Sequence, residues 1–171
     1  MTNSGSVDHV AIAVRSLDEA VRLFIDVLGA TFIGGGDDHR LGIRTLQVKL
    51  PPGIKIELMQ PISDDSYLAA YIEKHGEGFH HMTTFFDDIA ALILELDASD
   101  FTTVDTSYED PSWSETFVRP RAAFGALLQM VQTDRDWTVP HEHITPEDVI
   151  AGRVVWDGSD THLVSADADD G

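Results

Sequence analysis

The predicted order of secondary structure occurs twice along the chain. The segments VDHVAIAV (residues 7–14) and FHHMTTFF (residues 79–86) each predict a strand, and each precedes a short helix and three further strands. An internal repeat determines architecture because each copy is one supersecondary unit that buries its apolar face against a neighbour. We therefore expect an α+β fold with two tandem βαβββ modules, residues 1–61 and 78–135, in one compact domain.

Caps and turns mark the elements of the first module. Ser16 predicts the start of its helix and Gly29 predicts the end. A glycine- and aspartate-rich turn and a PPG turn separate the strands that follow. These strands are predicted over residues 31–34, 43–50 and 54–60.

The second module follows a connector, residues 62–77, which contains a predicted short helix over residues 67–75. Asp87 and Asp88 predict the start of the module's own helix, which continues to Leu96. Its later strands are predicted over residues 101–106, 115–119 and 126–132.

Residues 136–171 form a C-terminal extension beyond the two modules. Thr145 predicts a helix N-cap and Gly152 predicts the helix end. Residues 154–156 and 162–164 predict two strands that pair with the sheet or with a second subunit. We expect the last residues to be disordered.

Two pairs of polar residues recur at the same spacing. His9 and His81 lie on the first strand of each module, 72 positions apart (81 − 9 = 72). Glu57 and Gln129 lie on the last strands, also 72 positions apart (129 − 57 = 72). Adjacent strand residues point to opposite faces, so His80 is predicted to lie on the face opposite His81 and to pack or hydrogen-bond at an interface. If the modules pack with pseudo-twofold symmetry, the four repeated residues meet at one centre.

These four side chains predict a metal site. Two imidazoles, a carboxylate and an amide oxygen suit one divalent first-row metal ion with open positions, and Co, Mn, Ni, Zn and Fe are all candidates. A single histidine on an apolar strand is more often a core residue, and a buried glutamate is costly unless it is paired. Four such residues at matching repeat positions argue against independent core placement.

Charge and composition exclude several classes of partner. The formal net charge of −19 disfavours nucleic acid and anionic membrane surfaces. No apolar run approaches the roughly 18 residues of a membrane span, and the first residues lack the pattern of a secretory signal. The absence of cysteine excludes disulfides and thiolate metal sites. We expect a cytoplasmic protein that acts on a small molecule.

Several side chains are candidates for holding that molecule. Arg119 and Arg121 are the first candidates for binding an anionic group, with Arg40 and Arg44 next; solvated loop arginines are the alternative. The apolar residues predicted near the polar face, which suit an apolar portion of a substrate or an ordinary core, are Met59, Phe85 and Leu127.

One further histidine motif lies in the C-terminal extension. His141 and His143 form the sequence HEH. A short loop motif of this kind is weak evidence for a metal site, and we favour a surface turn.

The motifs DHVAIAV, IELMQP, GFHHM and RPRAAFGALLQM together resemble the vicinal oxygen chelate (glyoxalase/bleomycin resistance/dioxygenase) superfamily, and most closely its methylmalonyl-CoA epimerase-like proteins. The resemblance covers residues 7–132. It implies that the modules form a half-open, eight-stranded, barrel-like sheet around the metal, with His9, Glu57, His81 and Gln129 as ligands. It also implies a homodimer.

One residue departs from the pattern of the epimerases. Gln129 stands where they have a glutamate that binds metal and transfers a proton. A glutamine binds metal through its carbonyl oxygen but is not a useful base. The nearest positions to a second acid/base group, Thr45 and Gln47, are not carboxylates either. We therefore predict that Glu57 is both ligand and base.

The resemblance implies a metal-dependent isomerase or epimerase. Such an enzyme removes a proton alpha to the carbonyl or thioester of a 2-substituted acyl-CoA or similar compound, through a metal-stabilised enolate. The alternatives are a glyoxalase I-like lyase, an iron-dependent dioxygenase and a non-catalytic binding protein of the resistance type. The dioxygenases also place a glutamate on the last strand, which disfavours them. Four ligand-type residues argue against the binding protein.

Overall fold

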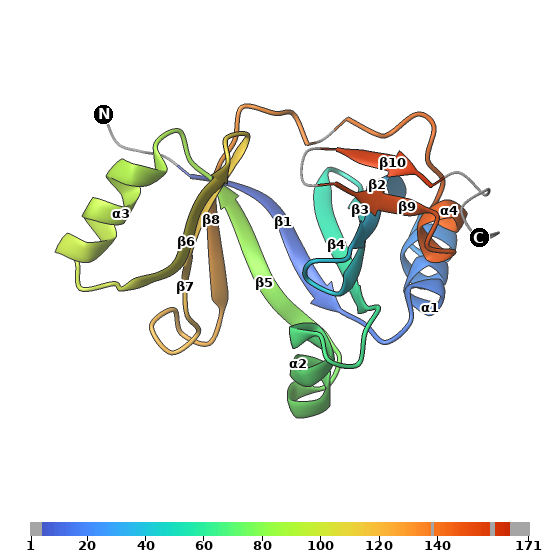
Figure 1. Cartoon of the computed structure of the whole chain (residues 1–171), viewed down its shortest axis with the longest axis horizontal. Coiled ribbons are helices and arrows are strands. Elements are labelled where there is room, and N and C mark those ends of the chain that lie inside the picture. The colour runs from blue at the N-terminus through green and yellow to red at the C-terminus, as the bar shows by residue number, and fades with distance from the viewer. Residues whose placement is uncertain (1–4, 138, 158–159, 165–171) are drawn as a thin grey trace, which may run out of the picture. The chain divides into compact units, whose positions relative to one another are not determined.

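The computed structural model describes residues 5–137, 139–157 and 160–164 (Figure 1). The chain divides into two compact units, and each is described by itself. The first unit comprises residues 1–11 and 79–137, and the second unit comprises residues 12–78 and 138–171. The boundary lies within the first strand, β1 (Ser6–Ala13), so this strand contributes to both units.

The predicted element order of both modules is observed. The first module contains β1, then helix α1 (Leu17–Val21) with its π-helical continuation η1 (Arg22–Val27), then β2 (Thr31–Asp38), β3 (Ile43–Leu50) and β4 (Ile54–Pro61). The connector contains α2 (Tyr67–His75), as predicted. The second module contains β5 (Gly78–Phe85), α3 (Ile89–Ala98), β6 (Thr103–Asp110), β7 (Trp113–Val118) and β8 (Leu127–Gln132).

In the first unit the strands follow the order β1-β5-β8-β7-β6. Strands β5 and β8 are parallel, whereas β8, β7 and β6 pair antiparallel. Helix α3 packs against the last three of these strands. The core beneath it is a buried apolar cluster: Leu92, Val118, Ala123 and Met130. Strand β6 ends the order, so this sheet is open.

In the second unit the order is β10-β9-β2-β3-β4-β1, with β9 (Val154–Trp156) and β10 (Thr161–Leu163) supplied by the C-terminal extension. Leu46, Val48 and Leu58 on β3 and β4 are fully buried. Strand β10 ends the order, so this sheet is also open. Ten strands of mixed direction and few helices confirm the predicted α+β class and its half-open character.

The predicted turn after residue 34 is wrong, because β2 continues to Asp38. Gly35 pairs with Leu46 of β3, and the pairing continues to Asp38 opposite Ile43. A Cβ atom on Gly35 would lie 2.3 Å from the backbone oxygen of Thr45. Glycine is therefore what allows the two strands to approach here, and a glycine-rich segment that resembles a turn in sequence forms a tightly paired strand.

Side-chain caps at the helix ends agree with the sequence. The Ser16 side chain accepts a hydrogen bond from the backbone N–H of Glu19, and Asp88 caps α3 in the same way. Gly29 has a positive φ of 70°, and its N–H donates to the carbonyl of Ile25.

The C-terminal extension joins the sheet of the second unit. Helix α4 (Pro146–Ile150) has the predicted Thr145 cap, and Val155 of β9 pairs with Asp37 of β2. Of the two alternatives for these strands, the structure shows pairing with the sheet. At the helix, the hydrogen bond from Arg153 holds the pKa of Asp148 below its usual value. The last residues, for which disorder was predicted, lie outside the described residues.

Over the described ranges, no helix combines the length and the apolar character that crossing a membrane requires.

Candidate metal centre

Strand β1 holds His9 in a buried position beside a carboxylate. His9 is 3% exposed, and its Nδ1 lies 2.6 Å from Oδ2 of Asp8, whose side chain is 4% exposed. A carboxylate only accepts hydrogen bonds, so this contact places a hydrogen on Nδ1. Nε2 is then the nitrogen with which His9 can bind a metal, and a carboxylate behind a metal-binding histidine is a common arrangement.

Strand β5 brings His81 close to His9. The ring centroids of the two histidines are 5.5 Å apart, with an angle of 71° between the rings. His81 is 7% exposed and His80 is 9% exposed. Nδ1 of His80 lies 2.8 Å from Nδ1 of His81. His80 therefore contacts His81 itself, a partner that the sequence did not predict.

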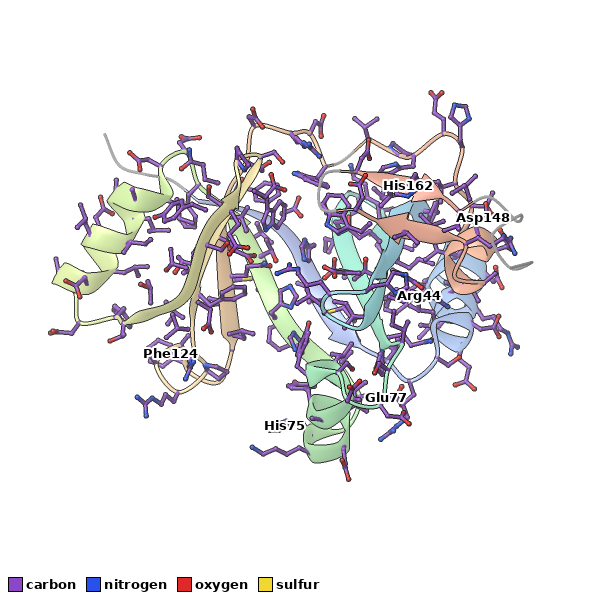
Figure 2. The ribbon with its side chains drawn as sticks, in the orientation of Figure 1. Arg44, His75, Glu77, Phe124, Asp148 and His162 are labelled. Atoms are coloured by element: carbon purple, nitrogen blue, oxygen red, sulfur yellow. The ribbon has the colours of Figure 1, made fainter. Side chains whose placement is uncertain are left out.

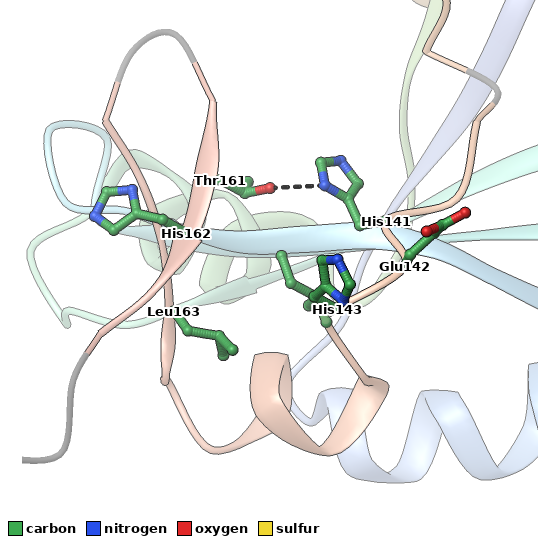
Figure 3. A pocket seen from close by; sticks show the side chains of 7 residues that line it. His141, Glu142, His143, Thr161, His162 and Leu163 are labelled. Carbon is green, nitrogen blue, oxygen red and sulfur yellow. Dashed lines mark hydrogen bonds between the residues drawn. The ribbon is translucent and has the colours of Figure 1, made fainter.

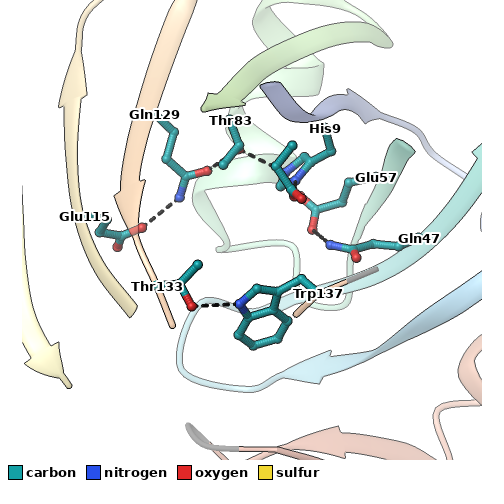
Figure 4. Close-up of polar contacts among 9 residues, drawn as sticks. His9, Gln47, Glu57, Thr83, Glu115, Gln129, Thr133 and Trp137 are labelled. Atoms are coloured by element: carbon teal, nitrogen blue, oxygen red, sulfur yellow. Dashed lines mark hydrogen bonds and ion pairs between the residues drawn. The ribbon is translucent and has the colours of Figure 1, made fainter. Parts of the chain in front are cut away.

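A chain of polar contacts connects His9 to the last strand of the first unit (Figure 4). Nε2 of His9 lies 3.0 Å from Oγ1 of Thr83, and Thr83 donates to Oε1 of Gln129 at 2.5 Å. Nε2 of Gln129 donates to Oε2 of Glu115 on β7 at 2.7 Å. Thr83 is fully buried. Two of the four predicted ligands, His9 and Gln129, are thus linked through Thr83, and His81 lies next to them through its ring contact with His9.

Glu57 lies in the second unit, on β4. It is directly opposite Gln47 of β3, whose Nε2 donates to Oε1 of Glu57 at 3.1 Å (Figure 4). Lys55 and Met59, which share its strand face, are buried. Glu57 itself is half-buried. Its carboxylate is therefore held by an amide from the neighbouring strand.

An aromatic cluster in the first unit lies next to the polar network of His9, Thr83, Gln129 and Glu115. Trp113 packs edge-on against Phe85, with centroids 5.9 Å apart, and against Trp137, with centroids 5.2 Å apart. Nε1 of Trp113 also donates to Oε2 of Glu115 at 3.0 Å. This aromatic cluster joins apolar surface to the polar network, because Trp113 belongs to both.

The arginines proposed for substrate binding occupy an exposed loop. Arg119 and Arg121 are both exposed, and NH2 of Arg119 lies 3.7 Å from Oδ2 of Asp105, itself 72% exposed at its side chain. Exposed pairs of this kind contribute little stability. A role for the two arginines in binding stays a prediction.

Arg44, labelled in Figure 2, has structural partners instead. Its Nε donates to Oδ1 of Asp37 at 2.5 Å and its NH2 donates to Oδ2 at 2.7 Å, while NH1 donates to the carbonyl of Ile150. The buried, bidentate pair joins β3 to β2, and the hydrogen bond to Ile150 attaches α4 to the same sheet. Arg40 is exposed and lies 3.9 Å from Asp38.

The HEH motif contributes to a small pocket in the second unit (Figure 3). His141 lies 3.2 Å from Oγ1 of Thr161 through its Nδ1, and His143 is exposed. The backbone N–H of His141 donates to the carbonyl of Ile33 on β2. The position is that of a surface segment next to β2.

Sequence reasoning missed two polar residues of the network. Asp8 precedes His9 in the DHV motif, so its place in the sequence offered a signal. Glu115 offered none, because it is opposite Val131 on β8 and reaches Gln129 diagonally. Thr83 follows His81 by two residues on β5 and so shares its strand face, and the structure adds its contacts to His9 and Gln129.

The donor types in the first unit fit a divalent metal. Buried imidazoles with a carboxylate behind one of them, together with an amide oxygen, are ligands for first-row metals such as zinc, cobalt and iron. Buried polar groups of this density are otherwise unfavourable in a core.

Comparisons with known proteins agree with this reading. A family model described as "Glyoxalase/Bleomycin resistance protein/Dioxygenase superfamily" matches residues 8–118. The human mitochondrial methylmalonyl-CoA epimerase is 27% identical over 133 residues, which cover 76% of this chain and 75% of that protein. The ethylmalonyl-CoA/methylmalonyl-CoA epimerase of Cereibacter sphaeroides is 35% identical over 88 residues, covering 51% of this chain and 65% of that protein.

A solved structure shares the fold. The crystal structure of methylmalonyl-CoA epimerase from Mycobacterium tuberculosis superposes with a TM-score of 0.67 at 27% identity, covering 75% of this chain and 88% of that one. The family match extends over more than half of the chain, and its residues include the first-strand histidines of both modules. The chain therefore belongs to the glyoxalase/bleomycin resistance protein/dioxygenase superfamily.

Proposed function

We propose that this protein is a divalent-metal-dependent isomerase of the epimerase type, which exchanges the proton alpha to the thioester of a 2-substituted acyl-CoA. The observation that supports it most is the paired His9 and His81, with Asp8 behind the first histidine. The epimerase names of the similar proteins supply the substrate class.

The proposed ligands are His9, Glu57, His81 and Gln129. The two histidines and Glu57 offer two imidazole nitrogens and one carboxylate oxygen. Glu57 is included because it precedes Gln129 by the repeat spacing (129 − 57 = 72) and is the carboxylate of the repeated set. When bound, the metal would supply a Lewis acid for the negative charge that develops on the thioester oxygen.

The residues of the chain would divide the remaining tasks. Asp8 keeps a hydrogen on Nδ1 of His9 and so keeps Nε2 available for the metal. Glu57 would take the alpha proton, since a glutamine at position 129 cannot. Gln47 would hold the Glu57 carboxylate through its side-chain N–H.

The substrate would be held by groups of two kinds. The aromatic cluster of Phe85, Trp113 and Trp137 suits an apolar portion. Arg119 and Arg121 suit the phosphates of coenzyme A, because guanidinium groups match phosphate geometry. A cytoplasmic location and a homodimer stay predictions of the sequence.

The experiment combines metal analysis with proton exchange. The purified protein is analysed for metals, reloaded with cobalt, and incubated with methylmalonyl-CoA in deuterated water. We expect about one metal ion per chain and deuterium at the alpha carbon. Glu57→Gln should abolish exchange, while Lys74→Gln, which changes an exposed side chain of α2, should leave it unchanged.

Three results would contradict the proposal. A protein without metal after reconstitution would remove the proposed centre. Iron in the purified protein with oxygen consumption would favour the dioxygenase alternative. Exchange at the wild-type rate in Glu57→Gln would remove Glu57 as the base.

A further inference from the structure

Glu115 is a polar residue next to the proposed centre to which the proposed function gives no role. Its Oε2 accepts two hydrogen bonds, from Nε2 of Gln129 at 2.7 Å and from Nε1 of Trp113 at 3.0 Å. An ionised carboxylate has acceptors and no donor. The nitrogen of the Gln129 amide must therefore face Glu115.

The position of the Gln129 amide oxygen follows from that of the nitrogen. With the nitrogen directed to Glu115, Oε1 lies on the side of Thr83, which donates to it at 2.5 Å. Oγ1 of Thr83 also lies 3.0 Å from Nε2 of His9. The oxygen is thus held on the His9 side of the amide, and Figure 4 shows these polar contacts from Glu115 to His9.

We propose that Glu115 is a positioning residue that fixes the Gln129 amide with its oxygen directed toward Thr83 and His9. This inference rests on the proposed function in one respect: Gln129 can bind a metal through its oxygen and not through its NH₂ group. A glutamine at this position requires an orienting partner, because rotation of the amide by half a turn exchanges oxygen for nitrogen. A carboxylate would not require one.

The surroundings of Glu115 make it suitable for this task. Trp113, its second donor, is held between Phe85 and Trp137. Glu115 follows Trp113 by two residues on β7 and therefore lies on the same strand face. Oε2 of Glu115 accepts a hydrogen bond from a tryptophan that is packed in an aromatic cluster. The Gln129 amide that donates to the same oxygen therefore has a defined orientation.

The same contact explains why a glutamate at position 129 would be unfavourable here. Gln129→Glu would place two carboxylates at the 2.7 Å contact, and like charges at such a distance do not both stay ionised. The carboxylate at position 115 and the amide at position 129 therefore form a matched pair. Exchanging both residues, as in Glu115→Gln with Gln129→Glu, restores one donor and one acceptor.

The test uses the full chain with and without cobalt. Metal affinity is measured by titration for wild type, Glu115→Ala, Glu115→Gln, Gln129→Glu and the exchanged double variant. The side-chain amide signals of Gln129 are followed by NMR in the metal-free protein and assigned by their loss in Gln129→Glu. Glu109→Gln, on an exposed position of β6, removes one negative charge without touching the network.

We expect Glu115→Ala to lower metal affinity about 10- to 100-fold, as loss of a partner behind a ligand typically does. The Gln129 amide protons should then exchange faster with solvent. Glu115→Gln should keep most of the affinity, since its oxygen still accepts both hydrogen bonds. The double variant should melt at a higher temperature than Gln129→Glu alone, and Glu109→Gln should resemble wild type.

The outcomes separate the two proposals. If Glu115→Ala resembles wild type in metal affinity and in amide exchange, Glu115 does not position Gln129, and the proposed function stands. If wild type binds no metal, the proposed function fails, and the amide signals alone decide whether Glu115 holds Gln129. Equal losses in Glu115→Ala, Glu115→Gln and Glu109→Gln would reduce the effect to charge and would overturn the inference.

Discussion

In each module a hydrogen bond between a glutamine and a glutamate connects the last two strands. The first module, in the second unit, has the glutamate on its last strand, and the second module, in the first unit, has the glutamine there. In the second unit, Glu57 lies on the last strand β4 and Gln47 on its neighbour β3. In the first unit, Gln129 lies on the last strand β8 and Glu115 on its neighbour β7. Both modules thus pair an amide with a carboxylate across their last two strands, directly opposite in the second unit and diagonally in the first, and the charge lies on a different strand in each.

This difference has a chemical consequence at each last strand. The carboxylate of Glu57 offers two equivalent oxygens, whichever way it turns. The amide of Gln129 offers one oxygen and one NH₂ group, so its orientation decides whether it can be a ligand. The partner on the neighbouring strand should therefore matter more in the first unit than in the second.

The largest expected effect tests whether His81 or its neighbour His80 is the metal ligand of the second module. His81→Ala should reduce bound metal from about one equivalent to none, because an imidazole ligand is lost. His80→Ala, next to it, should retain metal with lower affinity, since His80 contacts Nδ1 of His81. Elemental analysis after reconstitution measures both. Equal loss in the two variants would mean that His80 is as important as its neighbour.

The next effect compares the groups behind the two histidines. His9 has the carboxylate of Asp8 at 2.6 Å, whereas His81 has the imidazole of His80. Asp8→Asn should weaken metal binding about 10- to 100-fold, because the amide no longer imposes a hydrogen on Nδ1. Titration with cobalt measures it, with Asp97→Asn on the exposed side of α3 as control. Unchanged affinity would show that Asp8 is a packing residue.

The smallest effect concerns the pair in the second unit. Gln47→Leu removes the hydrogen bond to Glu57 and should lower the free energy of unfolding by about 1 kcal/mol. Metal affinity should fall less than in Glu115→Ala, since the carboxylate keeps two oxygens. Thermal unfolding and cobalt titration give the two values. An affinity loss as large as that of Glu115→Ala would remove the distinction between the two pairs.

Much of the fold was predictable because it depends on local patterns. Alternating apolar residues, the Ser16 and Asp88 caps and the PPG turn identified the strands and helices of both modules. The main error was the segment from Gly35 to Asp38, which is a strand. Glycine there serves the close approach of two strands, and composition alone cannot distinguish that use from a turn.

The sequence by itself determined the repeat, the family and the repeated residues at positions 9, 57, 81 and 129. These follow from spacing and motif, which are properties of a linear chain. The tertiary structure decided the partners: Asp8 for His9, and Glu115 and Thr83 for Gln129. Glu115 reaches Gln129 diagonally across paired strands, and that contact depends on register. Register is set by packing over a whole sheet and not by the residues that meet.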